Sequence, residues 1–429
     1  MTSLKQLFGG GARQFGMVFA LIALVLVFQI ATGGKVLTPT NAQNIINGNS
    51  YVLILAIGMV LVIIAGHIDL SVGSVAAVAG IIVALAIRDW GVPWWLGVLL
   101  GLAVGALIGA WQGFWVAYVG IPGFITTLAG MMFFRGANQY IGKANTVPVP
   151  DEIQYLGAGY LPEWGPNTGL NNSTLLLGVL AVVALVYGEV RRRRSARRLG
   201  GLAAPVWVSV VRVGALAVVI GYVTWLFGSG RVGTSFPFSG VILAALVLLY
   251  GFVSTRTVTG RHVYAVGGNK IAAALSGVNI RRTNFFVMMN MSMLAALAGI
   301  VFVGRSTASG PSDGTSWELD AIAAVFIGGA AVSGGVGTVV GSLIGGLVMA
   351  VLNNGLQLMG VGSDSTQMIK GLVLLAAVAF DVYNKVQGRP SIIGLLLRGR
   401  RKSEIPGGPE GPEVAGAVAG SKPDTLAQR

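Results

Sequence analysis

The 429-residue chain lacks cysteine and has only two histidines. Without cysteine it can form neither a disulfide framework nor a thiolate metal site. Two histidines leave too few ligands for a metal cluster, so we expect no metal and no other cofactor. The sequence also offers no convergent set of acid, base and metal that would support catalysis. An integral-membrane enzyme is therefore the least favoured class, and no residue is assigned a catalytic role.

Charge is scarce as well. Charged residues make up 10% of the chain and hydrophobic residues 54%, whereas a soluble domain carries about 25% charged residues. Apolar windows of about 20 residues recur along the whole sequence, which is typical of membrane-spanning helices. Because helices satisfy their backbone hydrogen bonds internally, we expect an all-α, polytopic integral membrane bundle. The net charge of +14 fits basic loops between the spans better than a nucleic-acid partner.

About twelve apolar segments are visible, and we expect 10–12 transmembrane segments. The segment at 321–333 is too short for a simple span, and a glycine-rich interruption follows it at 334–337. Half-helices and re-entrant turns are therefore expected in this part of the chain. The approximate spans are 15–31, 49–65, 71–87, 94–118, 122–135, 173–190, 206–227, 239–254, 284–303, 321–333, 338–358 and 366–383.

Loop charges predict the orientation. If the N-terminus (1–14) is cytoplasmic, the arginine-rich loop at 191–198 and the basic loop at about 255–283 both lie on the cytoplasmic side. This arrangement obeys the positive-inside rule. The membrane-embedded region covers 15–385, and 386–429 is predicted to be a basic and then disordered cytoplasmic tail. We therefore expect a multi-pass protein of the cytoplasmic membrane with both termini inside the cell.

A polar break interrupts the first half of the chain. Asp69 and Ser71, with His67 just before them, lie between two uncharged apolar runs. A carboxylate at that depth is costly, so it indicates a function such as lining a substrate pathway. The alternative, which is compatible with the first, is that Asp69 or Ser71 caps the next helix. His67 either pairs with Asp69 or titrates near neutral pH.

Other polar residues inside apolar segments leave two interpretations open. Asn353 and Asn354 lie in an apolar run and either join two helices or line the pathway. Glu318 and Asp320 are expected to cap the tenth segment and to face the extracytoplasmic surface. A row of glycines at every fourth position from 97 to 113 allows a second helix to approach closely; a pore-lining role is the alternative.

The basic loop at about 255–283 carries a second distinctive pattern. Residues 270–276 favour a short helix, and Gly277 can stop that helix with a left-handed cap. A short helix on the basic face is a suitable contact for a peripheral partner. The alternative is a solvated turn whose arginines only set the orientation.

Several of these motifs, taken in order, resemble the ribose/xylose-type monosaccharide ABC transporter permease family. The insertion at about 170–235, with its two extra spans, resembles the xylose permease branch most. The motifs are GMV at 58–60, IDLSVG at 68–73, FITTLAG at 124–130, YAVGGN at 264–269, ELDAIAA at 318–324, GGVG at 334–337 and NNG at 353–355.

The resemblance implies a function and partners. Such permeases form a pore of two copies, here expected to be a homodimer in membrane lipid. They receive a monosaccharide from an extracytoplasmic sugar-binding protein and couple to cytoplasmic ABC ATPase subunits. The chain has no phosphate-binding loop of its own, so ATP hydrolysis must occur on another polypeptide. An ion-coupled secondary transporter is the alternative, with Asp69 and His67 as its main ionisable candidates.

The resemblance also places the candidate sites. The substrate pathway is expected at His67, Asp69, Ser71, Asn353 and Asn354. ATPase coupling is expected at Gly267, Gly268, Asn269, Ala272, Ala273, Leu275, Ser276, Gly277 and Arg281. One departure is notable, because Lys270 stands near the position where relatives carry a glutamate, which puts a carboxylate-mediated docking bond in doubt.

Overall fold

The computed structural model describes residues 12–386, with gaps at 167, 199–204 and 232. The predicted tail (386–429) and most of the predicted N-terminal segment lie outside these residues. Within the described part, helices dominate, and one short antiparallel pairing joins strands β1 (Val147–Pro148) and β2 (Ala308–Ser309). The predicted all-α class is confirmed.

Seven helices of the described part are long and apolar enough to cross a membrane. They are α3 (Pro39–Ile64), α5 (Trp94–Phe114) with its π-helical extension η1 (Trp115–Val119), α8 (Asn172–Arg198), α9 (Val206–Gly228), α10 (Phe238–Arg256), α13 (Ile280–Ser306) and α15 (Val339–Leu358). Five further helices are α2 (Ala12–Ala31), α4 (Val72–Arg88), α6 (Gly123–Ile141), α14 (Trp317–Ile327) and α16 (Ser363–Val386). Together these twelve helices coincide one for one with the twelve predicted segments.

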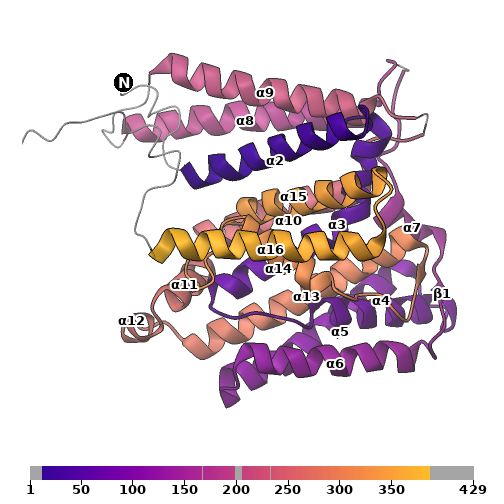
Figure 1. Cartoon of the computed structure of the whole chain (residues 1–429), viewed down its shortest axis with the longest axis vertical. Coiled ribbons are helices and arrows are strands. Elements are labelled where there is room, and N and C mark those ends of the chain that lie inside the picture. The colour runs from indigo at the N-terminus through magenta and orange to yellow at the C-terminus, as the bar shows by residue number, and fades with distance from the viewer. Residues whose placement is uncertain (1–11, 167, 199–204, 232, 387–429) are drawn as a thin grey trace, which may run out of the picture. The chain divides into compact units, whose positions relative to one another are not determined.

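Three short helices lie outside this set: α7 (Asp151–Ala158), α11 (Val258–Gly268) and α12 (Lys270–Leu275). Figure 1 shows α11 and α12 at one end of the helical bundle and β1 at the opposite end. The α11–α12 segment is the predicted short helical element of the basic loop. It follows α10 directly and leads into α13.

Helix α13 lies at the centre of the core and packs against α3, α4 and α5. The glycine row on α5 makes that contact possible. A Cβ on Gly105 would lie 2.6 Å from Cβ of Ala296, and one on Gly109 would lie 2.6 Å from Cα of Met289. The row therefore serves close packing of two helices, as one of the two interpretations predicted.

Helices α8 and α9 form a peripheral pair. They pack against each other (Figure 1), and α9 also contacts α3. Only 6% of the most apolar window of α8 is buried, compared with 72% for α3. The pair therefore presents most of its apolar surface to the surroundings, as expected of an added element at the edge of a membrane bundle.

Two breaks in the helices give the bundle its polar interior. The first separates α3 from α4, between Ile64 and Val72. The second follows α14, whose 11 residues span about 16 Å, half the thickness of a hydrocarbon core. Helix α14 packs along α15 so closely that a Cβ on Gly345 would lie 2.0 Å from the carbonyl oxygen of Ala324. The half-helix was expected from the length of this segment.

Candidate substrate pathway and coupling surface

The break between α3 and α4 is organised by Asp69. Its side chain is fully buried, and Oδ1 accepts hydrogen bonds from the Ser71 backbone N–H (2.8 Å) and hydroxyl (2.7 Å). Gln112 of α5 donates from Nε2 to the Ser71 hydroxyl at 2.7 Å, and the Leu70 N–H donates to Thr127 of α6 at 3.1 Å. Three elements therefore hold this turn in place.

The capping interpretation is correct for Asp69 only in part. Asp69 binds the N–H of Ser71, the residue that immediately precedes α4. Ser71 occupies the N-cap position, but its hydroxyl contacts Asp69 and Gln112 and makes no side-chain cap bond. The prediction that Ser71 itself caps the helix is therefore wrong. Its hydroxyl is used to fix the carboxylate.

A second carboxylate lies beside this turn. Glu318 on the first turn of α14 is 6% exposed, and its Oε2 would lie 2.8 Å from a Cβ on Gly73. Arg135 of α6 approaches the other oxygen of Glu318 at 3.7 Å. Oδ2 of Asp69 and Oε2 of Glu318 are both buried without a hydrogen-bond partner in the described part of the chain. Buried acceptors of this kind normally have a partner, so they mark a place where a hydroxyl-bearing ligand fits.

His67 does not pair with Asp69, so that prediction is wrong. The half-buried imidazole lies against Asn284 of α13 and Gly123 of α6, where a Cβ on Gly123 would lie 3.0 Å from Nδ1. Its Nε2 has no hydrogen-bond partner among the described residues. His67 and Asp69 therefore face different elements although they are two residues apart.

The two asparagines of α15 differ from each other. Asn354 exchanges hydrogen bonds with Asn41 of α3, each 2.8 Å long, and so joins two helices. Asn353 is half-buried and makes no hydrogen bond within the described residues. The helix-joining interpretation accounts for Asn354, whereas the amide of Asn353 is free to meet a substrate. A pathway role for either residue stays a prediction.

The expectation that Glu318 and Asp320 face the extracytoplasmic surface is wrong. Asp320 is 9% exposed and forms an ion pair with Lys370 of α16 at 2.8 Å. The loop before α14 folds into the bundle, because Gly314 and Gly73 are in backbone contact. Arg135 and Lys370 were missed as partners. The available signal was a lysine inside a predicted span, since such a residue normally has a buried partner.

The coupling loop forms as predicted. Asn269 precedes α12 and accepts a hydrogen bond from the Ala272 N–H at 2.9 Å. Helix α12 covers Lys270–Leu275, and Gly277 follows with φ of +83°, the left-handed conformation that favours glycine. Of the residues predicted to contact an ATPase, seven are exposed: Gly268, Asn269, Ala272, Leu275, Ser276, Gly277 and Arg281.

Gly267 and Ala273 point inward instead. Ala273 is buried, and Gly267 contacts the end of α3, where a Cβ would lie 1.6 Å from the carbonyl oxygen of Ile64. The same carbonyl accepts a hydrogen bond from the Gly335 N–H at 2.8 Å. We call this contact of Gly267, Ile64 and Gly335 the glycine junction. It brings the coupling loop into contact with both helix breaks.

Tyr264 of α11 reinforces the glycine junction. Its hydroxyl donates to the carbonyl of Gly337 in the α14–α15 loop at 2.7 Å. Burial raises the pKa of the Tyr264 phenol, so it stays a neutral donor at physiological pH. The coupling loop and the α14–α15 loop are therefore joined by a side chain as well as by backbone contact.

Helix breaks connected to an exposed basic loop define a membrane transport permease. Residues 41–378 match the protein family described as the permease component of the branched-chain amino acid transport system. This match covers most of the chain, and the protein belongs to that family. No solved structure matches the chain.

Curated relatives agree with the family. The xylose transport system permease protein XylH of Escherichia coli K12 is 41% identical over 86% of this chain and 92% of its own length. The XylH protein of Haemophilus influenzae is 38% identical over 86% and 96%. The ribose import permease protein RbsC of Escherichia coli K12 is 35% identical over 86% and 94%. The predicted resemblance to ribose/xylose-type permeases is confirmed.

Proposed function

We propose that this chain is the membrane subunit of an ABC importer that moves a monosaccharide, xylose or a similar sugar, into the cell. The proposal rests chiefly on the glycine junction, because it connects an exposed basic loop to the two places where the membrane helices break. The similarity to xylose and ribose permeases over 86% of the chain supports the choice of sugar. No observation favours the ion-coupled alternative.

The proposed sugar route passes the break between α3 and α4. Oδ2 of Asp69 and Oε2 of Glu318 are acceptors without partners in the described residues, and sugar hydroxyls are donors that suit them. Ser71 and Gln112 hold Asp69 in position. His67 and Asn353 belong to the proposed route because each has polar atoms that no described residue satisfies.

Alternating access follows from the same connections. When ATPase subunits bind ATP and displace α12, the glycine junction moves the end of α3 and the α14–α15 loop together. Both loops border the Asp69 region, so its exposure to the two sides of the membrane changes. The exposed apolar side chains of Ile271 (75%) and Leu275 (85%) on α12 offer a contact for the ATPase.

Orientation and the remaining partners complete the proposal. The coupling loop and the arginine-rich end of α8 belong to the cytoplasmic side, with both termini in the cytoplasm. The opposite end, which carries β1, receives sugar from an extracytoplasmic binding protein. A second copy of the permease completes the pore, as the resemblance to two-copy importers implies.

Reconstitution tests the function. Proteoliposomes that contain the permease, its ATPase and its binding protein should accumulate xylose only when ATP is supplied on the ATPase side. The matched control carries an ATPase without hydrolytic activity, and it should not accumulate sugar. Uphill uptake by the permease alone, driven by a proton or sodium gradient, would refute the proposal and establish the ion-coupled alternative.

A further inference from the structure

The arginines at the end of α8 divide into two groups by their contacts. Arg192 pairs with Glu189 at 2.9 Å. Arg193 donates to the Ser209 hydroxyl and to the Pro205 carbonyl of the α9 region, both at 2.8 Å. These two arginines therefore fasten α8 to its neighbour and to its own previous turn.

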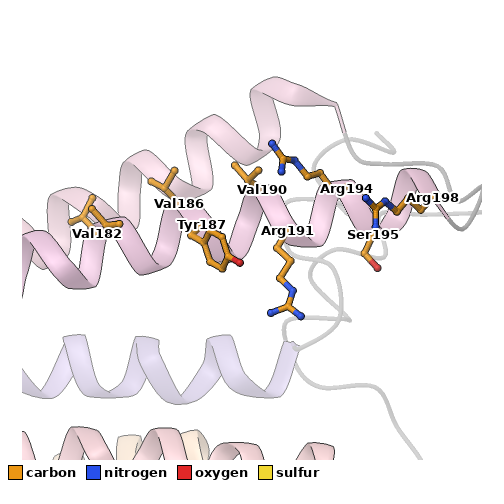
Figure 2. A pocket seen from close by; sticks show the side chains of 9 residues that line it. Val182, Val186, Tyr187, Val190, Arg191, Arg194, Ser195 and Arg198 are labelled. Carbon is orange, nitrogen blue, oxygen red and sulfur yellow. The ribbon is translucent and has the colours of Figure 1, made fainter.

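Arg191, Arg194 and Arg198 are different. All three are exposed, and they form no hydrogen bond or ion pair with the described residues. They line a groove of about 880 Å³ along one side of α8, shown in Figure 2. The other described residues that line it are Val182, Val183, Val186, Tyr187, Val190 and Ser195.

The groove has an apolar part and a basic part in sequence along the helix axis. The valines extend from Val182 to Val190, which is about 12 Å of helix, close to the depth of one membrane leaflet. The three arginines follow within the next two turns. Tyr187 is 65% exposed and lies close to the boundary, where tyrosine is favoured in membranes.

We propose that this groove binds an anionic phospholipid of the cytoplasmic leaflet. An acyl chain lies along the valines, and the phosphate is bound by Arg191, Arg194 and Arg198, which provide charge-assisted hydrogen bonds. The leaflet follows from the orientation given under the proposed function. The binding itself depends only on the residues of α8.

A purely topological role, an ATPase contact and a second copy of the chain all fit the groove less well. The positive-inside rule requires cations near this end of α8 but no particular face, whereas the cations without partners share the face of the valine row. A soluble ATPase could reach the arginines but not valines eight residues deeper in the span. A two-fold contact with a second copy would bring like charges together.

Native mass spectrometry of the purified full-length protein tests the proposal, with phosphatidylglycerol or phosphatidylcholine as the added lipid. The double variant R191Q/R194Q should lose affinity for phosphatidylglycerol by about 25-fold, at about fivefold per arginine. The matched control R192Q/R256Q removes the same charge from exposed cytoplasmic positions outside the groove. It should stay within about twofold of the original protein.

Three outcomes would overturn the proposal. They are equal retention of the two lipids by the original protein, equal loss of phosphatidylglycerol in both double variants, and a change of oligomeric state in R191Q/R194Q without a change in lipid binding. The last would assign the groove to a second copy. Because the assay needs no transport, its failure is distinguishable from failure of the proposed function.

Discussion

Replacing Gly267 with alanine is the sharpest test of the glycine junction. The added Cβ would lie 1.6 Å from the carbonyl oxygen of Ile64, so the two must move apart by about 1.4 Å to reach even the 3.0 Å that real contacts require. That movement also strains the hydrogen bond from the Gly335 N–H to the same carbonyl, now 2.8 Å.

The expected cost follows from these contacts. Overpacking a tight contact costs about 1–3 kcal/mol, and losing the hydrogen bond adds about 0.5–1.5 kcal/mol. We take about 2 kcal/mol as the lower end, which corresponds to a factor of about 30 in the population of the intact junction. The sugar moved per ATP hydrolysed should therefore fall by about 30-fold, while ATP hydrolysis continues.

The neighbouring glycine supplies the control. A Cβ on Gly268 meets nothing within 4 Å, so G268A should keep the ratio of sugar to ATP within about twofold. Both variants are compared in proteoliposomes with the ATPase and the binding protein, after equal assembly has been verified by size-exclusion chromatography. If G267A couples as well as G268A, the glycine junction does not transmit the movement of the ATPase.

Three further predictions concern the coupling loop, the sugar route and a buried ion pair. G277V should raise ATP hydrolysed per sugar moved, because φ of +83° at this position costs a β-branched residue about 1–2 kcal/mol; unchanged stoichiometry would show that the end of α12 does not dock the ATPase. D69A should abolish xylose uptake and leave assembly with the ATPase intact, and unchanged uptake would reduce Asp69 to a structural role. K370M should lower thermal stability by about 3–5 kcal/mol, because Asp320 is left buried and unpaired. The double variant K370M/D320L should recover most of that loss, and an equal loss in both variants would argue against the pair.

Hydropathy alone was enough to locate the membrane helices. All twelve apolar segments became helices, since a run of apolar residues must satisfy its backbone internally wherever it lies. The short helix α12 and its stop at Gly277 were also predictable, because both depend on neighbouring residues only. These successes share one cause, which is that the deciding interactions are local in sequence.

The polar contacts were not predictable for the opposite reason. His67 and Asp69 are two residues apart, yet one faces α6 and α13 while the other binds Ser71 in front of α4. The partner of Asp320 lies fifty residues further along the chain. The sequence indicates that such groups need partners, but the fold decides which residues supply them.

The glycine junction explains why a protein with so little charge can respond to an ATPase. A Cβ at Gly267 cannot fit against the carbonyl of Ile64, so the two backbones touch without an intervening side chain. Side chains can change rotamer and absorb a displacement, whereas backbone in direct contact transmits it. Because Gly335 bonds to the same carbonyl, the end of α3 and the α14–α15 loop must move with α11. Any motion of the coupling loop therefore reaches both borders of the Asp69 region at once, and neither helix break can rearrange alone.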